Sequence, residues 1–157
     1  AGIEVTMVSV DETAAVTGSH QITVQMDQLL SETDFDAFDL LVLPGGMPGT
    51  LHLEDCDGLM EQLDRFYSAG KWVAAICAAP QIFGHRGYLK GRKATSFPSM
   101  EKELDGAFVT HGAAEVDGNV ITGRGMGCAI DFALKIIGCL ISEEEAAAQA
   151  ERIVYER

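Results

Sequence analysis

Two short apolar runs that each stop abruptly in small residues constrain the fold of this chain most. The run at 40–43 continues into Pro-Gly-Gly at 44–46, and the run at 73–76 continues into Cys-Ala-Ala-Pro at 77–80. Short unbroken apolar runs bounded by Gly or Pro are typical of strands that are buried on both faces of a parallel sheet. Ligands bind beyond the carboxyl ends of such strands, so the small residues after these two runs are the expected site.

The remaining pattern alternates between strand-like and helix-like segments, which predicts an α/β fold with a mostly parallel sheet between two helical layers. A turn at 17–20 predicts a hairpin within 13–25, and Asp-Gly at 117–118 predicts a second hairpin. We expect an acidic connector with a helical turn at 27–37 and a loop at 47–50. Strands are expected at 3–10, 38–43, 72–76, 93–97, 108–110, 113–116 and 119–122, and helices at 55–69, 78–88, 98–104, 123–141 and 143–155. Ser142 followed by three glutamates resembles a capping box at the start of the last helix.

Composition limits the class of protein and its partners. The 157 residues suit a single domain spanning 1–157, and no apolar run is long enough to cross a membrane. The net charge of -13 argues against nucleic acid and anionic lipid as partners. No secretory signal is visible at the start of the chain.

The four cysteines are Cys56, Cys77, Cys128 and Cys139. They form no CxxC pair and do not cluster with histidine, so we expect no zinc or other metal site and no cofactor. Reduced thiols in a cytoplasm are the better interpretation, although an even number of cysteines leaves disulfides open. We expect Cys139 and Cys128 to fill space on the last long helix and Cys56 to be exposed.

Cys77 is the candidate nucleophile. It ends a strand and precedes a helix, where backbone N–H groups favour a thiolate, and the small Ala78 and Ala79 suit a tight turn. This arrangement is similar to a nucleophile elbow. Gly45 and Gly46 are expected beside it, where their backbone approaches a ligand and forms an oxyanion pocket with Ala78. The alternative is that Cys77 is a small buried apolar residue and that the glycines form a plain turn.

Other candidate motifs are weaker. The Gly-Arg-Gly-Met-Gly segment at 123–127 precedes a helix but lacks both the P-loop lysine and a complete dinucleotide fingerprint, which leaves Arg124 as a candidate contact for a small anion. Nothing in the sequence brings His52, His85 or His111 to Cys77. His85 lies eight residues further along the expected helix, which is about 12 Å. No G-x-S-x-G motif is present, so a serine triad is not supported.

Four segments, at 39–46, 74–80, 91–95 and 117–125, resemble the ThiJ/PfpI superfamily, most closely the clade of the Parkinson-disease-associated deglycase and its bacterial relatives. The similarity is collinear over nearly the whole chain. It implies a flavodoxin-like three-layer αβα sandwich and a homodimer. It further implies that Cys77 is the nucleophile and redox-sensitive residue, that the backbone of Gly45, Gly46 and Ala78 forms the anion pocket, and that Arg124 lies near it.

The resemblance also implies a choice of activities. The first is a cysteine-dependent enzyme that acts on reactive carbonyls, either as a glyoxalase without cofactor or as a deglycase of glycated substrates. The second is a non-catalytic redox sensor or stress chaperone that uses the same cysteine. A cysteine peptidase or amidotransferase is a weaker alternative, because it needs a histidine beside Cys77.

Two departures from the family pattern affect these expectations. Family members begin with a further strand and helix that carry a glutamate hydrogen-bonded to the cysteine, and Ala1-Gly2 looks like the end of such a helix. We therefore expect either that this unit belongs to a longer native protein, or that a partner supplies it, or that the site is inactive. Phe97 stands where some members have histidine, which excludes a Cys-His dyad through that position.

Overall fold

A four-stranded sheet forms the centre of the computed structural model, which describes residues 1–156. Its strands are β5 (Leu40–Leu43), β6 (Trp72–Ile76), β9 (Ala114–Asp117) and β10 (Val120–Gly123), in the order β5-β6-β10-β9. The strands β5, β6 and β10 are parallel and β9 is antiparallel. In register, Val73 lies between Leu41 and Val120, so the ends of β5, β6 and β10 meet at one edge.

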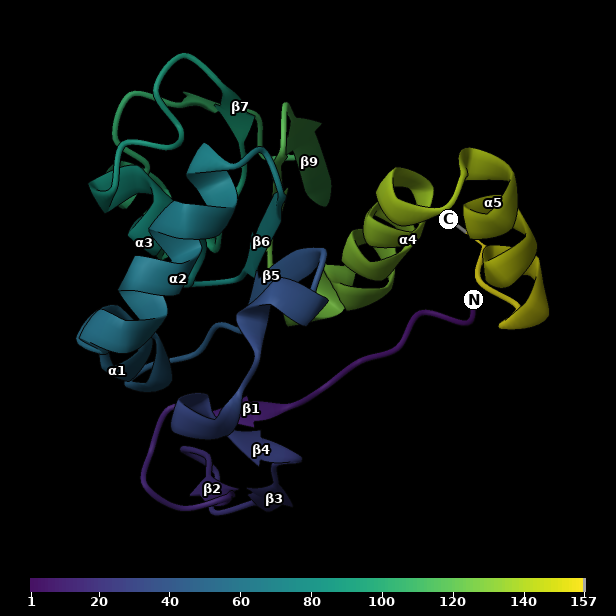
Figure 1. Cartoon of the computed structure of the whole chain (residues 1–157). Coiled ribbons are helices and arrows are strands. Elements are labelled where there is room, and N and C mark those ends of the chain that lie inside the picture. Colours follow the sequence, from purple (N-terminus) through teal and green to yellow (C-terminus); the bar gives the residue numbers. More distant parts are fainter. Residues whose placement is uncertain (157) are drawn as a thin grey trace.

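Helices cover both faces of this sheet (Figure 1). On one side lie α1 (Gly49–Glu54), α2 (Asp57–Ser68) and α3 (Pro80–His85), and on the other lie α4 (Ala129–Leu140) and α5 (Glu143–Arg152). Successive side chains of β6 point to opposite faces of the sheet, so this strand contributes to a hydrophobic core on each side. Val73 and Ala75 belong to the core that contains side chains of α2 and α3, whereas Ala74 packs with Phe132 of α4. The expected three-layer αβα sandwich with a mostly parallel sheet is confirmed.

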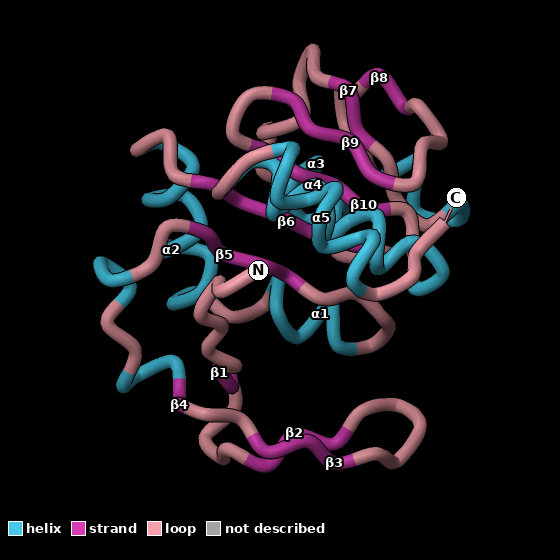
Figure 2. Tube along the Cα trace, turned by 90° about the vertical axis from the view of Figure 1, so that its right-hand side faces the viewer, coloured by secondary structure: helices cyan, strands magenta, loops and turns pink. Residues whose placement is uncertain are grey.

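Smaller elements complete the chain. Three two-stranded ladders pair β1 (Val8–Ser9) with β4 (Gln28–Leu29), β2 (Ala15–Thr17) with β3 (Thr23–Gln25), and β7 (Lys93–Ala94) with β8 (Phe108–Val109). The β2–β3 hairpin, which the turn at 17–20 predicts, stands apart from the central sheet (Figure 2). Short 3₁₀ helices are η1 (Leu30–Glu32), η2 (Phe35–Ala37), η3 (Pro98–Glu103) and η4 (Met126–Cys128).

Two local signals in the sequence are confirmed in detail. Gly118 has a φ of 61° at the tip of the β9–β10 hairpin, a conformation that glycine adopts at little cost. Ser142 caps α5, because its Oγ accepts a hydrogen bond of 3.1 Å from the backbone N–H of Glu145.

Several expected elements are shorter than their sequence pattern. The strand expected at 3–10 is regular only at Val8–Ser9, because a strand needs a partner along its whole length and this segment pairs only with β4. The strand expected at 93–97 stops at Ala94, since the N–H of Thr95 donates to the Thr122 hydroxyl instead of a neighbouring strand.

The helix boundaries also differ from the expectation. The helix expected at 78–88 covers only Pro80–His85, because residues 77–79 form the turn after β6, and the helix expected at 123–141 divides into η4 and α4. The loop expected at 47–50 is found at 47–48, whereas Gly49 and Thr50 begin α1. The helical turn expected in the connector at 27–37 is present as η1 and η2, and the connector also contains β4. Within residues 1–156, no helix has the length and apolar character needed to cross a membrane.

Candidate functional site

Cys77 occupies a sharp turn directly after β6. Its φ is 66°, in the left-handed region that L-residues other than glycine occupy at a cost of about 1–2 kcal/mol. Two hydrogen bonds impose this conformation: the N–H of Cys77 donates to the carbonyl of Gly123 at 2.9 Å, and its carbonyl accepts from the N–H of Phe97 at 2.8 Å. The elbow is therefore fixed from two sides, by the end of β10 and by the segment that leads into η3.

The glycine loop after β5 lies directly against this turn. A Cβ atom on Gly45 would lie 2.6 Å from the Cβ of Cys77 and 2.4 Å from the carbonyl oxygen of Ile76. Only glycine allows the two segments to approach so closely. Gly46 has a φ of 99°, and its carbonyl accepts hydrogen bonds from the N–H and Oγ1 of Thr50, at 2.9 and 3.0 Å, which fixes the start of α1.

The backbone donors beside the cysteine are not used within the protein. Neither the N–H of Gly46 nor that of Ala78 donates a hydrogen bond to another residue in the described part of the chain, 1–156. The Cys77 side chain is only partly buried, whereas Ala78 and Ala79 behind it are buried. A partly accessible thiol beside free backbone N–H groups can attack a carbonyl carbon and stabilise the negative oxygen that results.

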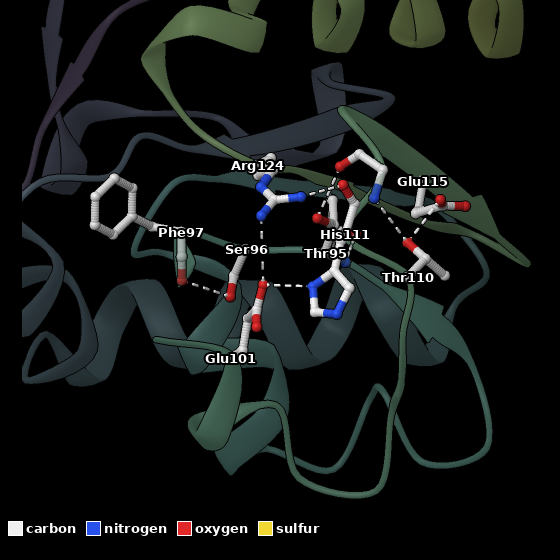
Figure 3. A network of polar contacts seen from close by, with 10 residues as sticks. Thr95, Ser96, Phe97, Glu101, Thr110, His111, Glu115 and Arg124 are labelled. Atoms are coloured by element: carbon white, nitrogen blue, oxygen red, sulfur yellow. Dashed lines mark hydrogen bonds and ion pairs between the residues drawn. The ribbon is translucent and has the colours of Figure 1, made fainter. Parts of the chain in front are cut away.

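Arg124 belongs to a polar network at the same edge of the sheet (Figure 3). Its Nη1 donates to the carbonyl of His111, and its Nη2 lies 4.0 Å from Oε1 of Glu101. Glu101 also accepts a hydrogen bond of 2.8 Å from Nδ1 of His111. These contacts hold η3 against the loop before β9, and the expected role of Arg124 in binding an anion stays a prediction.

Three other site residues were not indicated by the sequence: Glu54, Glu101 and Glu103. Glu54 and Glu103 lie on either side of His85, with Oε1 of Glu54 at 2.6 Å from Nδ1 and Oε2 of Glu103 at 3.3 Å from Nε2. Glu54 raises the pKa of His85 above its ordinary value, partial burial opposes this effect, and Glu103 adds to it. These partners are 31 and 18 residues from His85, so no local pattern could have revealed them.

The histidines predicted as candidate bases have other partners or are exposed. His85 and His111 are paired with glutamates, and His52 is exposed on α1. Within residues 1–156, no hydrogen bond joins a histidine to Cys77.

All four cysteines are free thiols. Cys56 packs partly buried against the main core, so the expectation that it is exposed is wrong: the turn before α2 brings its side chain inward. Burial raises the pKa of the Cys139 thiol, and Glu143 adds to that effect, so this thiol is poorly reactive. No group of three or more metal-ligating side chains occurs among the residues that the structure describes.

This geometry defines a class: αβα proteins that carry a cysteine in a strained turn after a central parallel strand, beside a glycine loop from the neighbouring strand. Residues 1–138 match the model of the DJ-1/PfpI family, and the chain belongs to that family.

The chain is similar to several known proteins, and the share of each relative's length that it covers varies. It is 37% identical over 147 residues to "Protein DJ-1 homolog B" of Arabidopsis thaliana, covering 92% of this chain but 34% of that protein, so it spans about a third of that relative. It is 38% identical over 119 residues to "Deglycase PfpI" of Pyrococcus furiosus, covering 74% of this chain and 70% of that protein. The structure of oxidized DJ-1 from Toxoplasma gondii matches with a TM-score of 0.92 at 33% identity, over 98% of this chain and 84% of that one.

Proposed function

We propose that this chain carries the site of a cysteine-dependent enzyme that acts on reactive carbonyls, of the deglycase or cofactor-free glyoxalase type. The observation that carries the proposal is the strained turn at Cys77, with the free N–H groups of Gly46 and Ala78 beside it. The name of the Pyrococcus furiosus relative supports the deglycase type at the level of the family.

The chemistry follows from the positions of these groups. The Cys77 thiolate attacks the aldehyde carbon of an α-oxoaldehyde, an S–C bond forms, and the carbonyl electron pair moves to the oxygen. The N–H groups of Gly46 and Ala78 donate to that oxygen. A carboxylate base, the role that the family resemblance gives to a glutamate of the preceding strand-helix unit, takes the proton from the first carbon and returns it to the second through an enediol. Water then hydrolyses the resulting thioester to a hydroxyacid and the free thiol.

The direct test is the conversion of methylglyoxal to lactate without glutathione or added metal. We expect lactate to accumulate with the native protein and to fall to background with Cys77→Ser, because serine is not ionised near neutral pH. Cys139→Ser is the matched control, since Cys139 lies on α4, is partly buried against the core cluster that contains Ala74 and Phe132, and is distant in sequence from the elbow. Turnover by Cys77→Ser equal to the wild type, or no lactate from native protein whose Cys77 is shown to be reduced, would contradict the proposal.

A second candidate is a redox sensor or stress chaperone that uses the same cysteine. The same N–H groups can hold a sulfinate on Cys77, and the solved Toxoplasma relative is described as oxidized. Mild peroxide should add two oxygen atoms to Cys77 before any other thiol, as measured by peptide mass spectrometry. Equal oxidation of all four cysteines would count against this role. The peptidase and amidotransferase alternatives lack a supporting histidine contact.

We also propose a homodimer in a reducing cytoplasm. The family resemblance and the four free thiols support this setting. Light scattering after size-exclusion chromatography should give twice the monomer mass, and a monomer mass at micromolar concentration would contradict the dimer.

A further inference from the structure

Three segments frame Cys77, and each leads away from it into a short helix. The Gly45–Gly46 loop leads into α1, the Cys77 turn leads into α3, and the segment of Phe97, whose N–H bonds the Cys77 carbonyl, leads into η3. The three helices end at Glu54, His85 and Glu103.

These three end residues meet in one contact. Nδ1 of His85 lies 2.6 Å from Glu54 and its Nε2 lies 3.3 Å from Glu103. A neutral imidazole carries one N–H, so hydrogen bonds to both carboxylates require the imidazolium. The ends of α1, α3 and η3 are thus joined through a single cationic ring, as long as that ring is protonated.

The backbone beside the ring is close-packed, whereas the His85 side chain itself is 37% exposed. A Cβ atom on Gly84, next to His85, would lie 2.0 Å from the carbonyl oxygen of Glu103, so α3 and η3 touch backbone to backbone. The amide of Gln81 donates to Glu54 at 3.3 Å, and Lys102 lies 3.2 Å from Glu103. Glu54, Glu103 and Lys102 are the charged groups that face this cluster from α1 and η3.

We propose that His85 is a positioning residue whose imidazolium ties the far ends of the three segments around Cys77 and so keeps the glycine loop and the turn, which carry the N–H groups of Gly46 and Ala78, fixed relative to each other. His85 is the last residue of α3, about 7.5 Å in helical rise beyond its first residue, Pro80, and Cys77 lies in the turn before the helix. The ring therefore acts through α1, α3 and η3 and not on the substrate. This inference rests on the proposed site at Cys77, but its test needs no carbonyl turnover.

The sign of the pH effect follows from the cluster. The tie is complete at pH values below the pKa of His85, which its carboxylate partners raise, and it is lost as the pH rises through that pKa. His85 should therefore increase the reactivity of the Cys77 thiol at pH values below the pKa of His85, and it should have no effect on that reactivity at pH values above it.

The experiment compares alkylation of Cys77 by iodoacetamide in the wild type and in His85→Gln between pH 5.5 and 9.5, with peptide mass spectrometry to resolve Cys77 from the other thiols. We expect the wild type to react about two- to tenfold faster at low pH, the equivalent of one net hydrogen bond, and the ratio to fall to one at high pH. Glu54→Gln should reproduce the profile of His85→Gln. His52→Gln, at an exposed histidine of α1, is the matched control and should follow the wild type.

A ratio that is the same at every pH would overturn the proposal, as would an equal loss in His52→Gln. If His85→Gln fails to fold by circular dichroism, Glu54→Gln carries the same test.

The wild type gives an independent measurement, in which an NMR titration follows the protonation of His85. The amide exchange rates of residues 46–54 and 78–85, corrected for the intrinsic pH dependence of exchange, should increase together as His85 loses its proton. No common increase would contradict the tie. Slow lactate formation with an intact alkylation profile would count against the proposed function alone.

Discussion

At the scale of single residues, the site depends on positions that tolerate only one kind of side chain. Cys77 is forced into a left-handed turn by hydrogen bonds to Gly123 and Phe97, and Gly45 is pressed against that turn. A strained backbone that its surroundings impose in this way is typical of functional turns.

Gly45→Ala tests this close approach. The new methyl group would overlap backbone atoms of Ile76 and Ala78, so we expect a loss of about 1–3 kcal/mol in the free energy of unfolding and slower alkylation of Cys77. Urea denaturation measures the first effect and mass spectrometry the second. Gly49→Ala is the matched control, because a Cβ there meets no atom within 4 Å. Equal stability of the two variants would show that the loop yields without disturbing the turn.

At the scale of elements, polar contacts fix how the helices on one face are placed. Asp64 of α2 accepts hydrogen bonds from Arg86, which follows α3, and from the hydroxyl of buried Tyr88. The Tyr88 ring stacks on Tyr67 of α2, with centroids 3.9 Å apart. These contacts join α2 to the end of α3 in the layer that also contains the His85 cluster.

Asp64→Asn should therefore destabilise the protein in a pH-dependent way. The hydrogen bond from Arg86 lowers the pKa of Asp64, burial opposes this, and Tyr88 adds to the lowering. A carboxyl with a lowered pKa contributes stability above its unfolded pKa of about 3.9, and this contribution is lost as the pH falls further. We expect a deficit of about 1 kcal/mol at pH 7, because the pair is partly exposed. The deficit should shrink as the pH falls below the unfolded pKa and be lost once the pH passes through the lowered pKa of native Asp64.

Urea denaturation at a series of pH values measures this deficit. Asp105→Asn, at an exposed aspartate, provides the comparison and should show a much smaller one. A deficit for Asp64→Asn that stays constant from pH 3 to pH 7 would indicate that charge is not involved.

At the scale of the whole molecule, the charge is strongly unbalanced. The chain has 24 acidic and 11 basic side chains, for a net charge of -13. A folded chain concentrates these like charges, and their repulsion opposes the compact state.

Added salt should stabilise the folded chain at neutral pH. An increase in NaCl from about 0.01 M to 0.1 M shortens the Debye length from about 30 Å to 10 Å and screens the repulsion. We expect the midpoint of urea unfolding to increase at pH 7. At the sequence pI of about 4.5, where the net charge vanishes, the increase should be much smaller. A midpoint that falls with salt at pH 7 would mean that the ion pairs on the surface outweigh the net repulsion.

The sequence by itself determined the parts of this protein that depend on neighbouring residues. It predicted β6 at its observed bounds, because a short apolar run between Lys71 and Cys77 is typical of a strand buried on both faces. It also predicted the Gly118 hairpin and the Ser142 cap, since turns and caps are formed by hydrogen bonds within a few residues. Two strand ends in small residues were enough to place Gly45 and Cys77 at the same edge of the sheet.

Only the tertiary structure decided what those residues contact. The left-handed φ of Cys77 is imposed by Gly123 and Phe97, which are 46 and 20 positions away along the chain. The partners of His85 and Arg124 lie on other elements, and the expected strand at 3–10 is short because alternation does not provide a neighbour to pair with. Backbone propensity acts over a few residues, whereas hydrogen bonds and ion pairs between elements depend on a packing that the whole chain determines at once.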